Sequence, residues 1–223
     1  MLPLLCLIPP PPTPASPSNT TTVFERVNVI PMDRERVLTD YDVLVRDGCI
    51  VSVARHGTVP LPAPATRIDG TGRWLMPGLA DMHVHLYDTE GFASYLAYGI
   101  TTVVNLNGEP ANLRWRDRVK RGGLLGPTVY TAGPSINGNP PGNSGFTAVE
   151  TTDQARAEVR RQWEMGYDFI KVYSTLPAPA YRAILSEAKA RNMGVLGHVP
   201  IEVGLKAVLE SDGNPTSPTQ RST

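Results

Sequence analysis

The sequence predicts an α/β protein in which a small β-rich region precedes a longer region of alternating strands and helices. From Val23 onward, apolar and polar residues alternate with a period of two, which is typical of half-buried strands. After Leu86, apolar β-branched runs alternate with amphipathic segments, which is the pattern of a parallel sheet with crossover helices. The composition, with 41% hydrophobic and 19% charged residues, is that of a globular protein.

The β-rich region is expected over residues 23–73, and it contains a clear hairpin signal. The pair Asp47-Gly48 separates two β-rich runs, 42–46 and 49–53. A type I′ turn needs positive φ at both central residues, and Asp-Gly is a favoured pair for that geometry. We therefore expect a tight hairpin at this point of a small β-domain.

The alternating region is expected over residues 74–210. Its later strands are expected at 100–106, 127–132, 167–173 and 193–198, and its helices at 91–98, 111–121, 151–166, 179–188 and 201–209. Thr151 and Gln154 have capping-box spacing, and Gly166 suits the end of that helix. In the last helix, Leu205, Val208 and Leu209 are expected to face inward.

The first strand of this region is expected at Trp74–Met82, buried, and followed closely by two histidines. Side chains two residues apart on a strand point to the same side, so His83 and His85 can offer imidazole nitrogens to one point. That arrangement suits a metal ion, and Asp81 is placed to orient a ligand from behind. The alternative is that this His-x-His pair binds no metal, as is common for such pairs on strands.

Two later residues have a chemical and a structural interpretation. Lys171 lies inside the apolar run 169–173, where an unpaired ammonium is costly, so it is paired, neutralised or functional, or else it reaches water at the strand end. His198 follows the strand 193–198, where a single histidine is either structural or a ligand. His56 lies in a polar, Gly-containing stretch and is expected to be a solvent-exposed loop residue.

The two ends of the chain differ from the rest. Residues 1–22 combine a short apolar run with Pro-rich and Ser/Thr-rich stretches, and the run is too short to span a membrane. A disordered leader and a cropped export signal both fit, so cytoplasmic and exported locations stay open. Residues 211–223 are rich in turn formers and are expected to be unstructured. The two cysteines, Cys6 and Cys49, do not settle the redox compartment.

The string around the two histidines resembles the first-strand signature of the amidohydrolase superfamily. Pro77-Gly78, Asp81, His83 and His85 occupy every position of that pattern. A second string, Gly197-His198-Val199-Pro200, is similar to the branch that includes imidazolonepropionase-like and prolidase-like enzymes. The resemblance implies a (β/α)₈ barrel, of which residues 74–210 supply about five of eight units, preceded by an incomplete β-sandwich. The long loop 133–147 then lies at the active-site face, as a lid or as a mobile segment.

The resemblance also implies a site and a reaction. His83 and His85 would hold a first divalent metal ion, expected to be zinc, and His198 a second. Lys171, carbamylated by carbon dioxide, would bridge the two. A metal-activated water would cleave a carbon–nitrogen bond in an amide, lactam or dipeptide. The superfamily's strand-six histidine and its strand-eight aspartate, which serves as general base, find no match here, so no catalytic residue is assigned.

Three functional interpretations follow. The chain is the N-terminal portion of such a hydrolase and is inactive alone, or it is an inactive fragment or metal-binding remnant, or it is another barrel enzyme with a coincidental His-x-His. With 21 basic and 21 acidic residues, nothing favours nucleic acid or a membrane as partner, so a small-molecule substrate is expected. The substrate itself and the oligomeric state are open.

Overall fold

The computed structural model describes residues 20–140, 142 and 145–211. Its contacts divide the chain into two compact units, Met1–Pro77 and Gly78–Thr223, a boundary four residues beyond the 73/74 division expected from the sequence. Most of the predicted leader and nearly all of the predicted tail lie outside the described residues. Each unit is described by itself.

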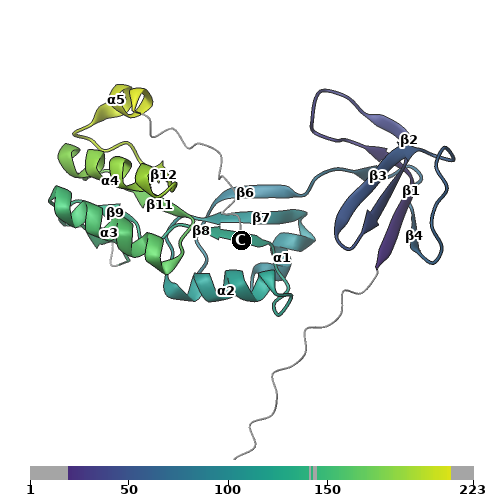
Figure 1. Ribbon diagram of the computed structural model, residues 1–223, viewed down its shortest axis with the longest axis horizontal. Helices are drawn as coiled ribbons and strands as arrows, with labels where there is room; N and C mark the ends of the chain where they lie inside the picture. The colour runs from purple at the N-terminus through teal and green to yellow at the C-terminus, as the bar shows by residue number, and fades with distance from the viewer. Residues whose placement is uncertain (1–19, 141, 143–144, 212–223) are drawn as a thin grey trace, which may run out of the picture. The chain divides into compact units, whose positions relative to one another are not determined.

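The first unit is a five-stranded sheet, with the strand order β3-β2-β1-β4 and with β5 also paired to β1 (Figure 1). The strands are β1 (Thr21–Val29), β2 (Leu38–Arg46), β3 (Cys49–Arg55), β4 (Thr66–Asp69) and β5 (Trp74–Leu75). The pairs β1–β2 and β2–β3 are antiparallel, whereas β4 and β5 run parallel to β1. The described strands form this one sheet, so the two-layered sandwich stays a prediction.

The predicted hairpin is confirmed. Asp47 and Gly48 join β2 to β3, and both have positive φ, at 50° and 77°. The period-two pattern also places the core of this unit, where Val27, Val29 and Val43 are buried together.

The second unit contains parallel strands connected mainly through helices. Its elements are β6 (Leu79–Val84), α1 (Phe92–Ala97), β7 (Ile100–Asn105), α2 (Pro110–Lys120), β8 (Thr128–Thr131), β9 (Ile136–Asn137), β10 (Thr147–Ala148), α3 (Thr152–Met165), β11 (Phe169–Val172), α4 (Ala178–Ala190), β12 (Gly194–Gly197) and α5 (Gly204–Glu210). The sheets have the orders β6-β7-β8 and β10-β9-β11-β12, and a parallel bridge between Ala132 and Phe169 links β8 to β11. The unit is therefore α/β with parallel pairing, as expected.

Local sequence signals place the helix ends well. Thr151 and Gln154 form the predicted capping box of α3, and Gly166 ends the helix in the left-handed region with a φ of 86°.

Two buried clusters hold the helices to the strands. One includes Ile170 of β11 and Ile184 of α4, and the other includes Val103 of β7 and Phe92 of α1.

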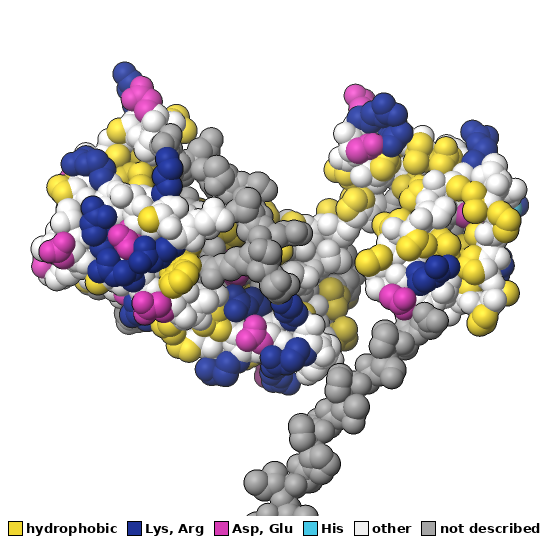
Figure 2. All heavy atoms as spheres, viewed as in Figure 1, with side chains coloured by type: hydrophobic (Ala, Val, Ile, Leu, Met, Phe, Trp, Pro, Cys, Tyr) yellow, Lys and Arg dark blue, Asp and Glu magenta, His cyan; other side chains and the backbone are white. Residues whose placement is uncertain are grey.

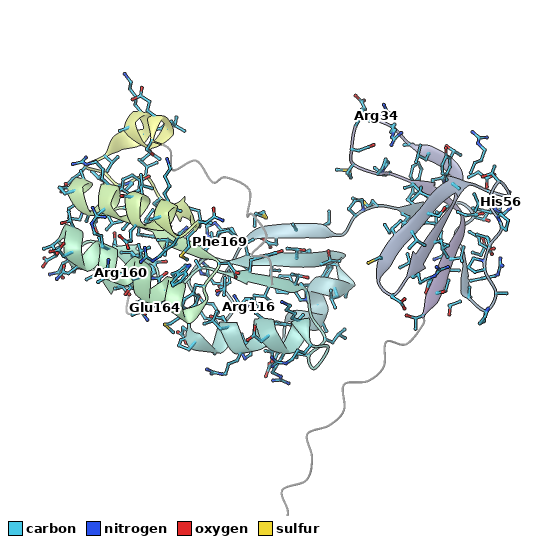
Figure 3. The ribbon with its side chains drawn as sticks, in the orientation of Figure 1. Arg34, His56, Arg116, Arg160, Glu164 and Phe169 are labelled. Atoms are coloured by element: carbon cyan, nitrogen blue, oxygen red, sulfur yellow. The ribbon has the colours of Figure 1, made fainter. Side chains whose placement is uncertain are left out.

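The outer faces of α3 and α4 carry mixed charges. Arg160 and Glu164 lie on the outward side of α3 in Figure 3, and Figure 2 shows basic and acidic side chains interspersed over these helices. Glu187 of α4 pairs with Arg156 and Arg160 of α3, so the charges join the two helices at their surface.

Three expectations need correction. The predicted strand Trp74–Met82 is interrupted between β5 and β6, and most of β6 is exposed, because β7 is the only strand paired with it among the described residues. In α5, Leu205 and Leu209 are exposed and only Val208 packs against the core. The loop 133–147 is anchored rather than wholly irregular, because its described part contributes β9, which pairs with β10 and β11.

Candidate metal centre

The two histidines of the His-x-His string lie at the carboxyl end of β6. His83 is the next-to-last residue of the strand and His85 follows it, with the two ring centroids 5.5 Å apart in an edge-to-face arrangement. Partial burial lowers the pKa of His85, and the positive charges of His83 and Lys171 lower it further. A lowered pKa favours the neutral imidazole, which is the form that binds metal ions.

Asp81 holds the backbone beside these histidines. Its carboxylate accepts a hydrogen bond from the backbone N–H of His83 at 3.1 Å. This contact fixes the main chain of a candidate ligand two residues along the strand. A contact from Asp81 to an imidazole ring stays a prediction.

Lys171 is a buried lysine in the middle of β11. Its residue surface is 4% exposed, and burial lowers its pKa. Among the residues that the structure describes, none forms a hydrogen bond or an ion pair with its ammonium group. Strand β11 is paired on both sides, with β12 at one edge and with β9 at the other. A buried ionisable group without a partner is a candidate functional residue.

His198 lies directly after β12, one strand away from Lys171. The preceding residue, Gly197, has a φ of 140°, and a Cβ there would lie 2.1 Å from the carbonyl oxygen of Val172. The backbone N–H of His198 donates to that same carbonyl at 3.1 Å. Glycine is therefore required for the close approach of β12 to β11 that positions His198.

Two residues that the sequence did not single out fix the imidazole of His198. The Ser174 Oγ lies 3.1 Å from Nδ1, and the Tyr173 ring stacks on the imidazole with centroids 3.8 Å apart. With Nδ1 occupied by the serine, Nε2 is the nitrogen left to bind a metal ion. Tyr173 and Ser174 come soon after Lys171 in the sequence. This closeness is the signal by which sequence analysis could have found them.

The candidate ligands share one electrostatic environment. Burial lowers the pKa of His198, and the charges of Lys171 and His83 lower it further. Over the described residues, no three His, Cys, Asp or Glu side chains lie close enough together to hold a metal ion. The donors therefore fit a metal site in kind, as three imidazoles and a lysine, and an acidic donor is what the set lacks.

His56, in the first unit, differs from expectation. Its Nδ1 lies 2.9 Å and 3.1 Å from the two carboxylate oxygens of Asp42, and its side chain is 36% exposed (Figure 3). It is a partly buried, paired histidine rather than a free loop residue.

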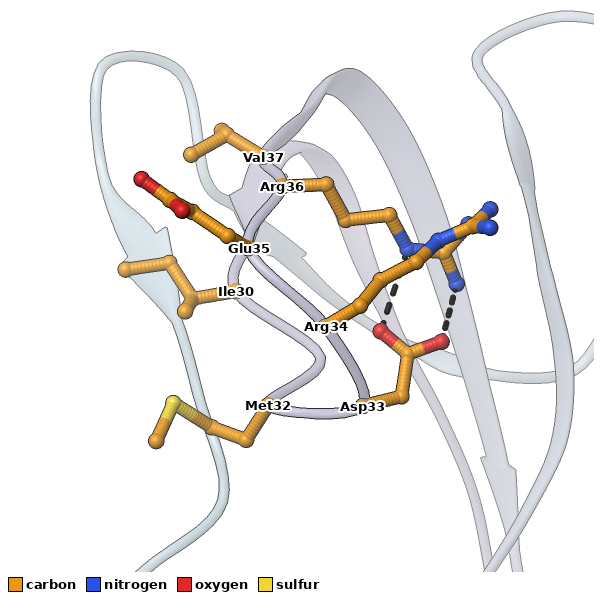
Figure 4. Close-up of a pocket in the computed structure, with 7 residues that line it drawn as sticks. All are labelled: Ile30, Met32, Asp33, Arg34, Glu35, Arg36 and Val37. Atoms are coloured by element: carbon orange, nitrogen blue, oxygen red, sulfur yellow. Dashed lines mark hydrogen bonds and ion pairs between the residues drawn. The ribbon is translucent and has the colours of Figure 1, made fainter.

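A separate pocket of about 500 Å³ lies on the loop between β1 and β2. Figure 4 shows its lining residues, which come from the single segment 30–37, with Asp33 and Arg36 joined by an ion pair. Met32 is 66% exposed, and none of the candidate ligands lines this pocket. It is a surface hollow in the first unit and supplies no metal ligand set.

Comparisons with known proteins give relatives for the chain. An imidazolonepropionase from Stenotrophomonas maltophilia is 43% identical over 67 residues, which cover 29% of this chain and 16% of that protein. An adenine deaminase from Paracoccus denitrificans is 32% identical over 144 residues, covering 60% of this chain and 23% of that protein. No family model matches the chain.

Solved structures extend the similarity to most of the chain. A bottromycin amidohydrolase aligns with a TM-score of 0.74 and 25% identity, over 85% of this chain and 41% of that one. A Xaa-Pro dipeptidase aligns with a TM-score of 0.67 and 21% identity, over 81% of this chain and 57% of that one. The chain thus spans about half the length of these solved structures and less than a quarter of the curated relatives. No helix among the described residues is long and apolar enough to cross a membrane.

Proposed function

Because the chain belongs to the amidohydrolase superfamily, we propose that it carries the metal-binding strands of a hydrolase that cleaves a carbon–nitrogen bond in a small molecule. His83 and His85 are the ligands of a first divalent metal ion, expected to be zinc. His198 would hold a second ion, and Lys171, as its carbamate, would supply an anionic oxygen ligand. When bound, such an ion polarises a carbonyl group and lowers the pKa of a bound water to about 7.

Lys171 is the observation that carries this proposal. A buried lysine without a partner among the described residues has a lowered pKa, so its amine is neutral over a wider pH range and is nucleophilic. The amine nitrogen forms a bond to the carbon of carbon dioxide and releases a proton to solvent. The resulting carbamate supplies the acidic donor that the set of imidazoles lacks, and bound divalent cations would offset its negative charge.

The other residues of the site have positioning roles in this proposal. Ser174 holds Nδ1 of His198, so Nε2 is the nitrogen that would bind a metal ion, and Tyr173 fixes the plane of the ring. Asp81 holds the backbone of His83. Second-layer contacts of this kind typically change metal affinity by about 10–100-fold when they are removed.

The fold supports the same proposal. We assign β6, β7, β8, β11 and β12 to the first five strands of a (β/α)₈ barrel, in which active sites lie at the carboxyl ends of the strands. His83 and His85 lie at that end of β6, and His198 lies at that end of β12. The small sheet of the first unit is assigned to a β-sandwich.

Zinc binding tests the ligand assignment. The parent protein is titrated against a chromophoric chelator, beside the double variant His83→Ala/His85→Ala and the control His56→Ala, which removes a histidine of the other unit. We expect the double variant to lose most of the zinc affinity and the control to keep it. Equal zinc affinity in the parent and the double variant would contradict the assignment.

Turnover by the 223-residue chain alone is a second test. Proton transfer is worth typically about 10²–10⁴-fold in rate, and neither the superfamily's strand-eight aspartate nor its strand-six histidine is assigned to a residue of this sequence. We therefore expect no turnover of Xaa-Pro dipeptides, N-acyl amino acids or lactams with added zinc. Zinc-dependent hydrolysis that His83→Ala abolishes would show that the chain supplies its own base.

A further inference from the structure

Two buried asparagine side chains hold the backbone of Leu86, the residue after His85. The Asn105 Oδ1 accepts the Leu86 N–H at 3.1 Å, and the Asn112 Nδ2 donates to the Leu86 carbonyl oxygen at 3.0 Å. Asn105 is 0% exposed and Asn112 is 1% exposed. The backbone N–H and the backbone carbonyl of Leu86 are therefore both hydrogen-bonded, by side chains from β7 and α2.

The sheet by itself fixes this part of the chain poorly. The pairing of β6 with β7 is regular at Ala80 and Asp81, and it then shifts by one residue before it resumes at Val84 opposite Asn105. A shift of this kind is a bulge, which redirects side chains and interrupts the ladder of hydrogen bonds. Met82 and His83 lie in the interrupted part, and β7 is the only described strand beside β6 (Figure 1).

The pairing on either side of His85 is restored by buried contacts. On its amino side, the Val84 carbonyl oxygen accepts the Leu106 N–H at 3.0 Å. On its carboxyl side, Leu86 is held by the two asparagines, and its side chain is buried with Phe92. His85 therefore lies between two anchored residues, although its own ring is accessible.

The two asparagines are themselves held in one orientation. The Asn105 Nδ2 donates to Thr131 Oγ1 of β8 at 3.0 Å, and the Asn112 Oδ1 accepts the Glu109 N–H at 2.7 Å as part of the capping box of α2. The Asn105 amide thus joins Leu86 to β8, and the Asn112 amide joins it to the first turn of α2. An alanine at either position leaves a buried backbone group of Leu86 without its partner.

We propose that Asn105 and Asn112 are positioning residues for His85, which fix the backbone after it so that its imidazole stays beside that of His83. This inference rests on the proposed function for its consequence in metal binding. The placement of the His85 ring by the two asparagines applies to the metal-free chain as well.

The first experiment reads ring placement in the metal-free protein. Histidine-ring NMR signals, few because the chain has only 4 histidines, are compared in the parent, Asn105→Ala and Asn112→Ala. The control is Gln162→Ala, which removes another buried amide that donates to a backbone carbonyl, that of Pro134, at 2.9 Å. We expect the His85 signal to split or broaden in both asparagine variants while the His56 signal is unchanged. Normal far-UV circular dichroism confirms that each variant is folded.

Zinc affinity is the second readout, measured with the same variants. Loss of a second-layer contact raises the dissociation constant by about 10–100-fold, and we expect this for both asparagine variants and not for Gln162→Ala. In a His85→Ala background, Asn105→Ala should cause no further loss, because the ligand that it positions is gone. A merely structural role would give the same loss in both backgrounds.

The outcomes separate the two proposals. If the parent binds zinc and both asparagine variants bind it equally well with an unchanged His85 signal, the positioning role is wrong and the proposed function stands. If the parent binds no zinc, the proposed function fails, and the His85 signal alone decides the positioning role. Should Asn105→Ala fail to fold, Asn112→Ala, which removes a single hydrogen bond to Leu86, decides it.

Discussion

Asp42 and Lys171 are both buried ionisable residues, one in each unit, and their surroundings differ completely. Asp42 is 5% exposed and accepts hydrogen bonds from the His56 ring and from the backbone N–H of Arg26 at 3.0 Å. Lys171 is 4% exposed and has no hydrogen bond or ion pair with any described residue. A similar degree of residue burial thus goes with a charge that is paired in one unit and with a charge that has no partner among the described residues in the other.

We interpret this difference as the one between a structural charge and a candidate functional charge. A buried charge that is paired and hydrogen-bonded is costly to remove, because its partners are left unsatisfied. A buried charge without partners opposes folding, which favours a role other than stability. We infer that Asp42 stabilises the β1–β2 pairing and that Lys171 is kept for chemistry.

The largest expected effect is that of Asp42→Ala. Removing the carboxylate leaves the Arg26 N–H and the His56 ring without their acceptor, and we expect a loss of about 3 kcal/mol in the free energy of unfolding. Hydrogen exchange of peptides from β1 and β2 measures it, with peptides from β11 as the internal control. Unchanged protection in β1 and β2 would mean that the pair contributes nothing to this unit.

Lys171→Met is expected to have the opposite sign. Methionine fills a similar volume without a charge, so the metal-free protein should gain roughly 1–3 kcal/mol in the free energy of unfolding. Protection of β11 and β12 peptides is the measurement, and Lys206→Met is the matched control, since the Lys206 side chain is 89% exposed. If Lys171→Met lowered the free energy of unfolding, the ammonium group would have a stabilising partner. The contrast between Asp42 and Lys171 would then not hold.

Local sequence signals account for much of this fold. The Asp47-Gly48 turn, the capping box at Thr151 and the end of α3 at Gly166 were predictable, because each depends on the backbone preferences of neighbouring residues. The apolar residues on either side of Lys171 indicated a buried strand, whereas the burial of Lys171 itself was one of two alternatives that the sequence left open.

Expectations that depended on contacts between residues far apart in the sequence were wrong or could not be formed. The sequence of β6 suggests a buried strand, yet burial requires a neighbour at each edge, and only β7 is paired with it among the described strands. Leu205 and Leu209 of α5 are likewise exposed, although their spacing on the helix suggests an inward face. The contacts of Ser174 with His198 and of Asn105 with Leu86 join residues 24 and 19 positions apart, and no local pattern announces them.

The pH dependence of stability tests the comparison between Asp42 and Lys171 further, through a smaller expected effect. Burial raises the pKa of Asp42, but the hydrogen bonds from His56 and Arg26 outweigh it, so the pKa lies below its ordinary value of 3.8. The stability that Asp42 contributes is therefore fully present above about pH 4–5 and is lost as the pH falls through the folded-state pKa. Acid unfolding of β1 and β2, followed by hydrogen exchange, should be less steep in Asp42→Asn.

Lys171 acts in a different pH window. Its folded-state pKa is below the ordinary 10.5, so the unfolded chain binds more protons between the two values and stability rises with pH there. Lys171→Met should abolish this alkaline rise in the metal-free protein, and Lys206→Met should not. A rise that persists in Lys171→Met would assign it to another group.

Ser174→Ala is expected to have the smallest effect. The variant removes the hydroxyl that holds Nδ1 of His198 at 3.1 Å, and we expect about a tenfold weaker affinity for the second zinc ion. The first ion, at His83 and His85, should bind as in the parent. A chelator titration resolves the two sites, and weakening of both would show that Ser174 acts on the whole unit rather than on His198.

Carbamate formation at Lys171 tests the central claim most directly. The protein is equilibrated with zinc and carbon-13 bicarbonate, and a carbamate carbon signal is sought by NMR in the parent, in Lys171→Met and in Lys206→Met. We predict a signal in the parent and in Lys206→Met that zinc strengthens and that is missing from Lys171→Met. A parent protein that binds zinc without any carbamate signal, or a signal that survives Lys171→Met, would contradict the assignment of Lys171 as the functional buried charge.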